Sequence, residues 1–272
     1  MLDNLSKIQE ESDNTSKFET VDGKPHLLSQ DYNYAHVAAK FAGAEIASTI
    51  INSQDIANSL IQKYGSIPVL ITSEGFVTST TAIAKYIWRM TENSLLGKDE
   101  FEQSQIEEAI NLADQELVCQ TKSIMYLLTG RIPCESHYKL NYIVGELKKQ
   151  LEEYNKQLEG KEYLIGSSIT LADIQLASYI RYPLAMAINP PFRNKVLNFM
   201  NWYYRITPSG GHFESTLGRL KLWTKMLKTP KIDNKPPKDD KKAQDKKEKP
   251  EKQKKKKGGK EAPKEDQKAE SK

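Results

Sequence analysis

Cysteine is scarce in this chain of 272 residues, and long apolar runs are missing. The two cysteines, Cys119 and Cys134, do not form a close pair of the zinc-binding or redox type, which suits a reducing cytosol. No apolar run approaches the ~18 residues of a membrane-spanning helix. The N-terminus lacks the basic-then-apolar order of a signal peptide. We therefore expect a cytoplasmic protein without membrane contact.

The sequence also lacks motifs for metal, nucleotide or triad chemistry. Its histidines, His26, His36, His137 and His212, show neither metal-ligand spacing nor a Ser/Asp signature. The glycine pair at 210–211 indicates a turn rather than a phosphate-binding loop. We therefore predict no catalytic residue, no metal and no cofactor.

Charge is distributed unevenly along the chain. Residues 230–272 contain 17 Lys and 10 acidic residues, a net charge of +7, whereas the whole chain carries +4. Residues 1–229 therefore carry −3. The segment 230–272 has no aromatic and almost no aliphatic side chains, so burial cannot offset the ~1–2 kcal/mol of entropy lost per ordered residue. We predict a disordered lysine-rich tail. Its lysines are interleaved with ten acidic residues and no aromatic residue is present to stack on bases, so a solvated linker or solubilising tail is the first interpretation. Weak, salt-dependent contact with RNA or a ribosome surface is the alternative.

The order of elements in residues 25–93 indicates a thioredoxin-like domain, preceded by a loose polar leader at 1–24. Short β-branched runs predict strands, and apolar spacing of three and four residues predicts helices. In chain order we expect a strand at 26–28, a helix at 34–43, a strand at 44–51, a helix at 55–64, a hairpin of strands at 69–71 and 75–77, and a helix containing Ile83, Tyr86, Ile87 and Met90.

Residues 99–229 predict a separate all-helical domain, with loops at 131–133, 189–191 and 208–211. Its clearest local signal is the sequence from Thr170 to Asp173. Thr170 is suited to cap a helix, and Asp173 can accept the Thr170 N–H, as in a capping box. Loss of the Thr170 hydroxyl is expected to cost about 1 kcal/mol. The apolar residues that follow predict a buried helix ending near Pro183.

Ile67-Pro68-Val69, Ser79 to Ile83 and the capped segment at Thr170 together resemble the glutathione-transferase-like fold. The resemblance implies an α+β thioredoxin-like domain with a cis-proline at Pro68, followed by an all-α domain. Enzymes of this family bind the glutamyl end of glutathione through an acidic residue or Gln followed by Ser. Here the pair is Ser79-Thr80, and Ser79 supplies no charge. We interpret Ile67, Pro68, Ser79 and Thr80 as the remnant of a glutathione site.

Family enzymes also require a hydroxyl or thiol near the end of the first strand to stabilise the glutathione thiolate. Ser29, Tyr32 and Tyr34 lie in this region, and the sequence does not choose between them. Residues 27–32 contain no basic side chain that would hold an anion. A polar loop is the more economical interpretation of this segment.

Near the end of the helical region the chain has a run that contains Leu217, Gly218, Lys221, Leu222, Lys225 and Met226. This run resembles the gamma-subunit family of elongation factor 1, in which a similar run precedes a lysine-rich linker. We expect the run to be a helix with an apolar stripe (Leu217, Leu220, Trp223 and Leu227) and with lysines turned to water. Tyr179, Tyr182 and Trp202 are candidates for a partner-facing surface.

This resemblance implies a non-catalytic scaffold subunit. The family's transferase-like domain holds the subunit that exchanges nucleotide on the GTPase delivering aminoacyl-tRNA, so the GTPase would be reached indirectly. Self-association is compatible with the family. Two alternatives stay open: a glutathione transferase, and a transferase-like appendage of a tRNA-synthetase assembly. The family carries a further domain after the linker, so we expect a short variant or a fragment.

Overall fold

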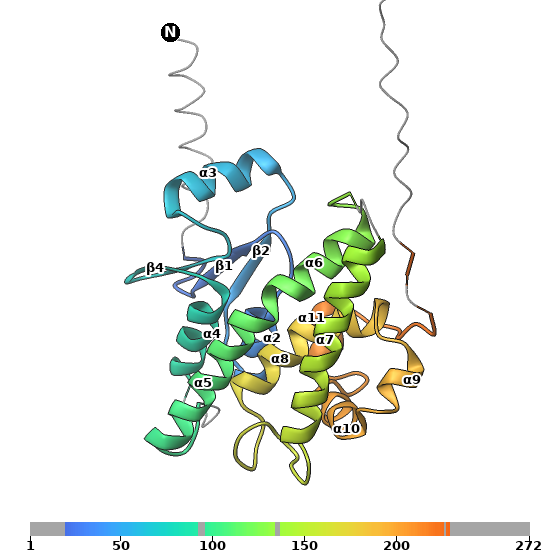
Figure 1. The fold of residues 1–272 in the computed structure, drawn as a ribbon. Helices are drawn as coiled ribbons and strands as arrows, with labels where there is room; N and C mark the ends of the chain where they lie inside the picture. Colours follow the sequence, from blue (N-terminus) through green and yellow to red (C-terminus); the bar gives the residue numbers. More distant parts are fainter. Residues whose placement is uncertain (1–19, 92–95, 134–136, 226, 229–272) are drawn as a thin grey trace, which may run out of the picture. The chain divides into compact units, whose positions relative to one another are not determined.

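The computed structural model describes residues 20–91, 96–133, 137–225 and 227–228 (Figure 1). The predicted tail, most of the predicted leader, Cys134 and Met226 lie outside these residues. Within them, no helix combines the length and apolar character needed to cross a bilayer.

A small mixed sheet forms the N-terminal part, as predicted. Its order is β2-β1-β3-β4, with β1 parallel to β2 and antiparallel to β3, and with β3 antiparallel to β4. β-branched and apolar residues in short runs favour these strands, and a two-residue turn closes the β3–β4 hairpin. The strands are β1 (His26–Ser29), β2 (Ala47–Ile50), β3 (Val69–Thr72) and β4 (Gly75–Thr78).

Three helices accompany the sheet: α2 (Tyr34–Ala42), α3 (Gln54–Tyr64) and α4 (Thr80–Arg89). Local capping explains their limits. The Asn33 side chain accepts the Ala35 N–H at the start of α2, and Gly43 ends α2 with φ 67°, a conformation that glycine adopts without steric cost. Ser53 caps α3, which ends at Gly65. The strand–helix order predicted from the sequence is confirmed.

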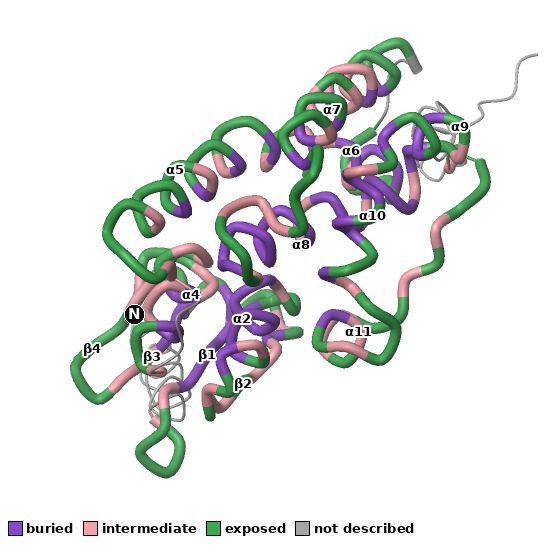
Figure 2. Tube along the Cα trace, turned by 90° about the horizontal axis from the view of Figure 1, so that it is seen from below, coloured by how far each residue is buried: buried purple, intermediate pink, exposed green. Residues whose placement is uncertain are grey.

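The remaining described residues are helical or irregular. Helix α8 lies at the centre, and almost every side chain from Leu171 to Ala177 is buried. Figure 2 shows buried residues concentrated in β1, α2 and α8, and exposed ones along the outer faces of α5 and α7. The helices are α5 (Glu100–Glu116), α6 (Val118–Thr129), α7 (His137–Gln157), α8 (Leu171–Met186), α9 (Pro190–Arg193), α10 (Leu197–Ile206) and α11 (His212–Leu217).

One hydrophobic core joins the sheet to the helical part. It contains Leu27 and Leu70 from the sheet, Ile87 from α4, Ile110 from α5 and Ile180 from α8. Both parts belong to a single compact unit. The division into a thioredoxin-like domain at 25–93 and an all-helical domain at 99–229 stays a prediction.

Two sequence predictions in the helical part are wrong. Helix α8 does not end near Pro183 but continues to Met186, and the Ala187 N–H still donates to the Pro183 carbonyl at 2.8 Å. The expected loop at 189–191 contains the start of α9. Asn189 caps this short helix, and two prolines occupy its first turn, where a missing N–H has no cost.

The predicted helix over residues 217–226 is also wrong. Leu217 is the last residue of α11, and Gly218 follows with φ 77°. Residues 218–225 and 227–228 are irregular, and we call them the strap. Trp223, expected on an apolar stripe, is 49% exposed. Leu222 and Leu227 pack against the core instead, whereas the lysines at 221, 225 and 228 are exposed, as predicted.

Candidate functional site

A cavity of about 590 Å³ lies between the loop after β1, the start of α4, and helices α6 and α8. The structure brings most of the predicted glutathione-site residues to it. Ile67, Pro68 and Thr80 line the cavity, and the Ile67–Pro68 peptide bond is cis. Ser79 is not among its lining residues. The three hydroxyl candidates also line it: Ser29, Tyr32 and Tyr34.

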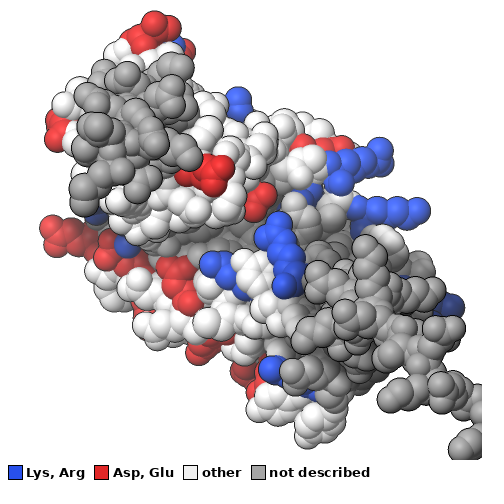
Figure 3. All heavy atoms as spheres, turned by 90° about the horizontal axis from the view of Figure 1, so that it is seen from above, with Lys and Arg blue, Asp and Glu red and all other residues white. Residues whose placement is uncertain are grey.

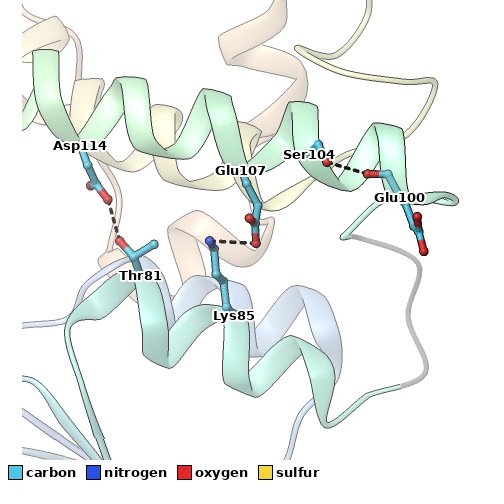
Figure 4. A network of polar contacts seen from close by, with 6 residues as sticks. All are labelled: Thr81, Lys85, Glu100, Ser104, Glu107 and Asp114. Atoms are coloured by element: carbon cyan, nitrogen blue, oxygen red, sulfur yellow. Dashed lines mark hydrogen bonds and ion pairs between the residues drawn. The ribbon is translucent and has the colours of Figure 1, made fainter.

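The Tyr34 hydroxyl is held in a buried polar network. It bonds to the Thr81 hydroxyl, which donates to an Asp114 oxygen at 2.9 Å. Figure 4 shows Thr81 on α4 directed at Asp114 on α5, beside the parallel contact of Lys85 with Glu107. Burial raises the pKa of Tyr34 well above its usual value. Because Thr81 donates its own proton to Asp114, the Tyr34 proton is used in the bond to Thr81, which leaves the Tyr34 hydroxyl poorly placed to donate to a thiolate.

Asp114 also accepts hydrogen bonds from α8. The Gln175 side-chain amide donates to it at 2.9 Å and the Tyr179 hydroxyl at 2.5 Å. Burial is the main cause that raises the pKa of Tyr179. The ring of Tyr179 meets that of Tyr34 edge-on at 5.6 Å between centroids. The hydroxyls of Tyr34 and Tyr179, two residues that line the cavity, are therefore both hydrogen-bonded within the protein.

The other two hydroxyl candidates differ in accessibility. Ser29 is buried, and its hydroxyl donates to the Asp31 carbonyl at 2.9 Å. Tyr32 is 55% exposed at the mouth of the cavity, and its ring meets that of His36 edge-on. Of the three, only Tyr32 is an exposed residue.

Two basic side chains line the cavity although the sequence prediction placed none there. Lys122 belongs to α6. Arg131 lies just after the end of α6, and its guanidinium is 5.6 Å from the centre of the Tyr126 ring. Both lie far beyond β1 in the sequence, so no local pattern could have identified them. The cavity can therefore hold an anionic group on its α6 side.

Ser79 is the N-cap position of α4 and has an unusual backbone conformation. Its φ is 74° and its ψ is 126°, a region that residues with a Cβ atom rarely adopt. Such a conformation costs roughly 1–3 kcal/mol. Its side chain makes no capping hydrogen bond.

We expect Ser79→Gly to raise the free energy of unfolding by about 1 kcal/mol, because glycine relieves the positive φ but loses more entropy on folding. Urea denaturation of the full chain measures this change. Ser53→Gly is the matched control. Ser53 also caps a helix, but with φ −87° and with a hydroxyl that accepts the Ile56 N–H. The control should lose a few tenths of a kcal/mol. A loss of stability in both variants would contradict strain at Ser79.

The predicted cap at Thr170 is the N-cap of α8, and Asp173 does more than complete it. One carboxylate oxygen accepts the Thr170 N–H and hydroxyl, each at 2.8 Å. The other accepts the Leu164 N–H at 2.9 Å and the Trp202 indole N–H at 2.8 Å. Burial raises the pKa of Asp173, and these donated hydrogen bonds oppose that rise. Trp202 is fully buried, so its prediction as a partner-facing residue is wrong.

Buried arginines attach the strap and its neighbouring residues to α8. Arg181 donates to the carbonyls of Leu217 and Gly218. Arg193 donates to the Trp223 carbonyl at 2.9 Å, and the Trp223 N–H donates to the Ala185 carbonyl at 3.1 Å. Carbonyls at a helix C-terminus have no partner within the helix, so the strap supplies one.

Comparison with known proteins defines the class. The family described as "Glutathione S-transferase, C-terminal domain" matches residues 139–209. The GST-like domain of elongation factor 1-gamma from Saccharomyces cerevisiae superposes with a TM-score of 0.64 at 17% identity, over 77% of this chain and all of that one. Maize glutathione S-transferase I superposes with a TM-score of 0.62 at 19% identity, over 71% of this chain and 96% of that one. The chain therefore has the glutathione-transferase-like fold.

Sequence relatives narrow the class further. Elongation factor 1-gamma 3 from Oryza sativa subsp. japonica is 27% identical over 76% of this chain and 50% of its own length. Elongation factor 1-gamma from Drosophila melanogaster is 26% identical over 63% of this chain and 40% of its own length. The chain thus spans about half the length of these relatives or less. The predicted resemblance to elongation factor 1-gamma is confirmed. Valine–tRNA ligase from Takifugu rubripes is 30% identical over 46% of this chain and 10% of its own length.

Proposed function

We propose that this chain is a non-catalytic scaffold subunit of a translation elongation factor 1 complex. Its transferase-like part would hold the guanine-nucleotide-exchange subunit, and the GTPase would be reached through that subunit in the cytoplasm. The elongation factor 1-gamma relatives, which match over up to about three quarters of the chain, support this proposal.

The state of the cavity favours a scaffold over an enzyme. Tyr34 is bonded to Thr81 within a network that ends at Asp114, and Ser29 is bonded to the Asp31 carbonyl. Ser79 supplies no charge for the ammonium group of glutathione. The commitment of two of the three candidate hydroxyls, those of Ser29 and Tyr34, to bonds within the fold is the observation that carries the non-catalytic proposal.

Two alternatives keep some support. The cavity, with Thr80 and Pro68 in its wall and Lys122 opposite, leaves a glutathione transferase open. The match to valine–tRNA ligase supports a transferase-like appendage of a tRNA-synthetase assembly. It covers less of this chain than the elongation factor matches do, so we rank it lower.

The decisive test is affinity capture with the immobilised full chain at ~0.3 M salt, where weak phosphate contacts are screened. We expect the exchange subunit in fixed proportion to the bait, and the same binding when the purified subunit is added alone. Recovery of tRNA synthetases in its place would favour the second alternative. Absence of both would refute the assembly proposals.

Glutathione titration separates scaffold from transferase. We expect no saturable heat when glutathione is added to the full chain, and no change in stability for Thr80→Ala beyond a few tenths of a kcal/mol, since Thr80 lies at the first turn of α4. Isothermal calorimetry measures the binding of glutathione, and urea denaturation measures the stability of Thr80→Ala. Saturable binding that Thr80→Ala weakens would instead establish a working glutathione site.

A further inference from the structure

A second groove lies away from this cavity, between α7 and the strap. It has a volume of about 520 Å³ and is open to solvent. The N-terminal half of α7 forms one wall, and the strap together with the start of α9 forms the other. Its polar and small lining residues are Asn141, Gly145, Lys148, Asn189, Thr224 and Lys225.

The walls of the groove are fixed by the fold. On the strap side, hydrogen bonds from Trp223 to Ala185 and from Arg193 to Trp223 hold the backbone next to Thr224. On the α7 side, Gly145 provides the space, because a Cβ atom built on it would meet nothing within 4 Å. The packing of α7 and the strap therefore determines the shape of the groove.

The described residues that line the groove include two lysines and no acidic residue. Lys148 approaches from α7, with its ammonium 5.3 Å from the centre of the Phe192 ring, and Lys225 is exposed on the strap. On the face shown in Figure 3, Lys and Arg side chains gather mostly on one side and acidic side chains mostly on the other. Asn141 and Asn189 add amide groups that can donate and accept hydrogen bonds.

Large aromatic side chains stand exposed next to these lining residues in the sequence. Tyr138 is 79% exposed and Tyr142 is 59% exposed, one helical turn apart on α7 and next to the turn that holds Asn141 and Gly145. Trp223, adjacent to Thr224 on the strap, is 49% exposed. Exposed aromatic faces beside cations are the combination that single-stranded nucleic acids use, because bases stack while lysines contact phosphates.

We propose that the groove between α7 and the strap binds single-stranded RNA. A phosphate lies between Lys148 and Lys225, the amides of Asn141 and Asn189 contact sugar or base edges, and neighbouring bases stack on Tyr142 and Trp223. An acidic peptide would satisfy the lysines but would leave the aromatic faces without a role. The inference does not depend on the scaffold function.

Fluorescence anisotropy with a short labelled oligouridine tests this site in the full chain. We expect Lys148→Gln/Lys225→Gln to weaken binding about tenfold, and to make the slope of log K against log salt shallower by about 1.4, the value for two lost phosphate contacts. Gly145→Leu fills the groove without changing charge, and should also weaken binding about tenfold. Its melting temperature should not fall, because leucine favours a helix and the space is free.

The matched control is Lys149→Gln/Lys156→Gln, which removes two charges from α7 outside the groove, where both lysines pair with glutamates. It should change binding less than about twofold. Ultraviolet crosslinking should attach uridine to Tyr138, Tyr142 or Trp223. Unchanged binding in both groove variants, or an equal loss in the control, would overturn the proposal and leave the lysine-rich segment as the contact. Displacement of RNA by polyglutamate as readily as by unlabelled oligouridine would make the groove an acidic-peptide site.

Discussion

Asp173→Ala is expected to lower the free energy of unfolding by roughly 3–5 kcal/mol. The substitution removes the acceptor for three N–H groups, from Leu164, Thr170 and the Trp202 indole. Trp202 is fully buried, and so is the carboxylate, so water cannot replace the lost bonds without opening the core. A loss of this size is a large part of the total stability of an ordinary domain.

Chemical denaturation followed by Trp fluorescence measures this effect, and Thr170→Ala is the control. It removes one hydroxyl but keeps the carboxylate and its three N–H partners, so it should cost only about 1 kcal/mol. Comparable losses in the two variants would show that Asp173 acts as a helix cap alone. The expected difference would show that it joins α8 to α10 and to the preceding loop.

His36 is expected to make stability depend on pH by about 3 kcal/mol between pH 6.5 and pH 4. The residue is 5% exposed, its Nδ1 accepts the Asn33 N–H, and its Nε2 lies 3.0 Å from the Ser48 hydroxyl. Burial lowers the pKa of His36 to about 4 from 6.5. The unfolded chain therefore takes up a proton below pH 6.5 that the folded chain refuses until about pH 4. The stability that His36 contributes is complete above pH 6.5 and is lost as the pH falls from 6.5 to about 4.

Urea titrations at a series of pH values in that window measure the slope. In His36→Asn the side chain cannot titrate, although its amide can still donate and accept a hydrogen bond. The loss of stability between pH 6.5 and pH 4 should therefore be smaller by about 3 kcal/mol. His212→Asn is the control, because His212 lies exposed at the start of α11. Parallel curves for the parent and His36→Asn would show that another group controls the acid sensitivity.

Local signals in the sequence predicted the sheet and its helices well. Short apolar strands and the three- and four-residue apolar spacing of helices act within a few residues, so one segment contains the information. The same holds for the start of α8 at Thr170. Asp173 was predicted as part of a cap, whereas its bond to Trp202 joins residues 29 apart. No spacing rule contains that contact.

The errors share a physical cause, which is that tertiary partners override local periodicity. The stripe of Leu217, Leu220 and Trp223 has helical spacing, yet the strap bonds to the end of α8 and to two buried arginines. The cavity shows the same limit. The sequence predicts its loop residues, but Lys122 from α6 and Arg131 from the segment just after α6 also line it. Thr80 was singled out, whereas its neighbour Thr81 makes the bond to Asp114.

The core shared by the sheet and the helices limits how such a fold can be inherited. Leu70 and Ile87 belong to the same buried cluster as Ile110 and Ile180, so either half alone would expose an apolar face to water. A gene fusion that carried only one half would gain an aggregation-prone fragment. The smallest cassette that recombination can move intact between larger proteins is therefore both halves together.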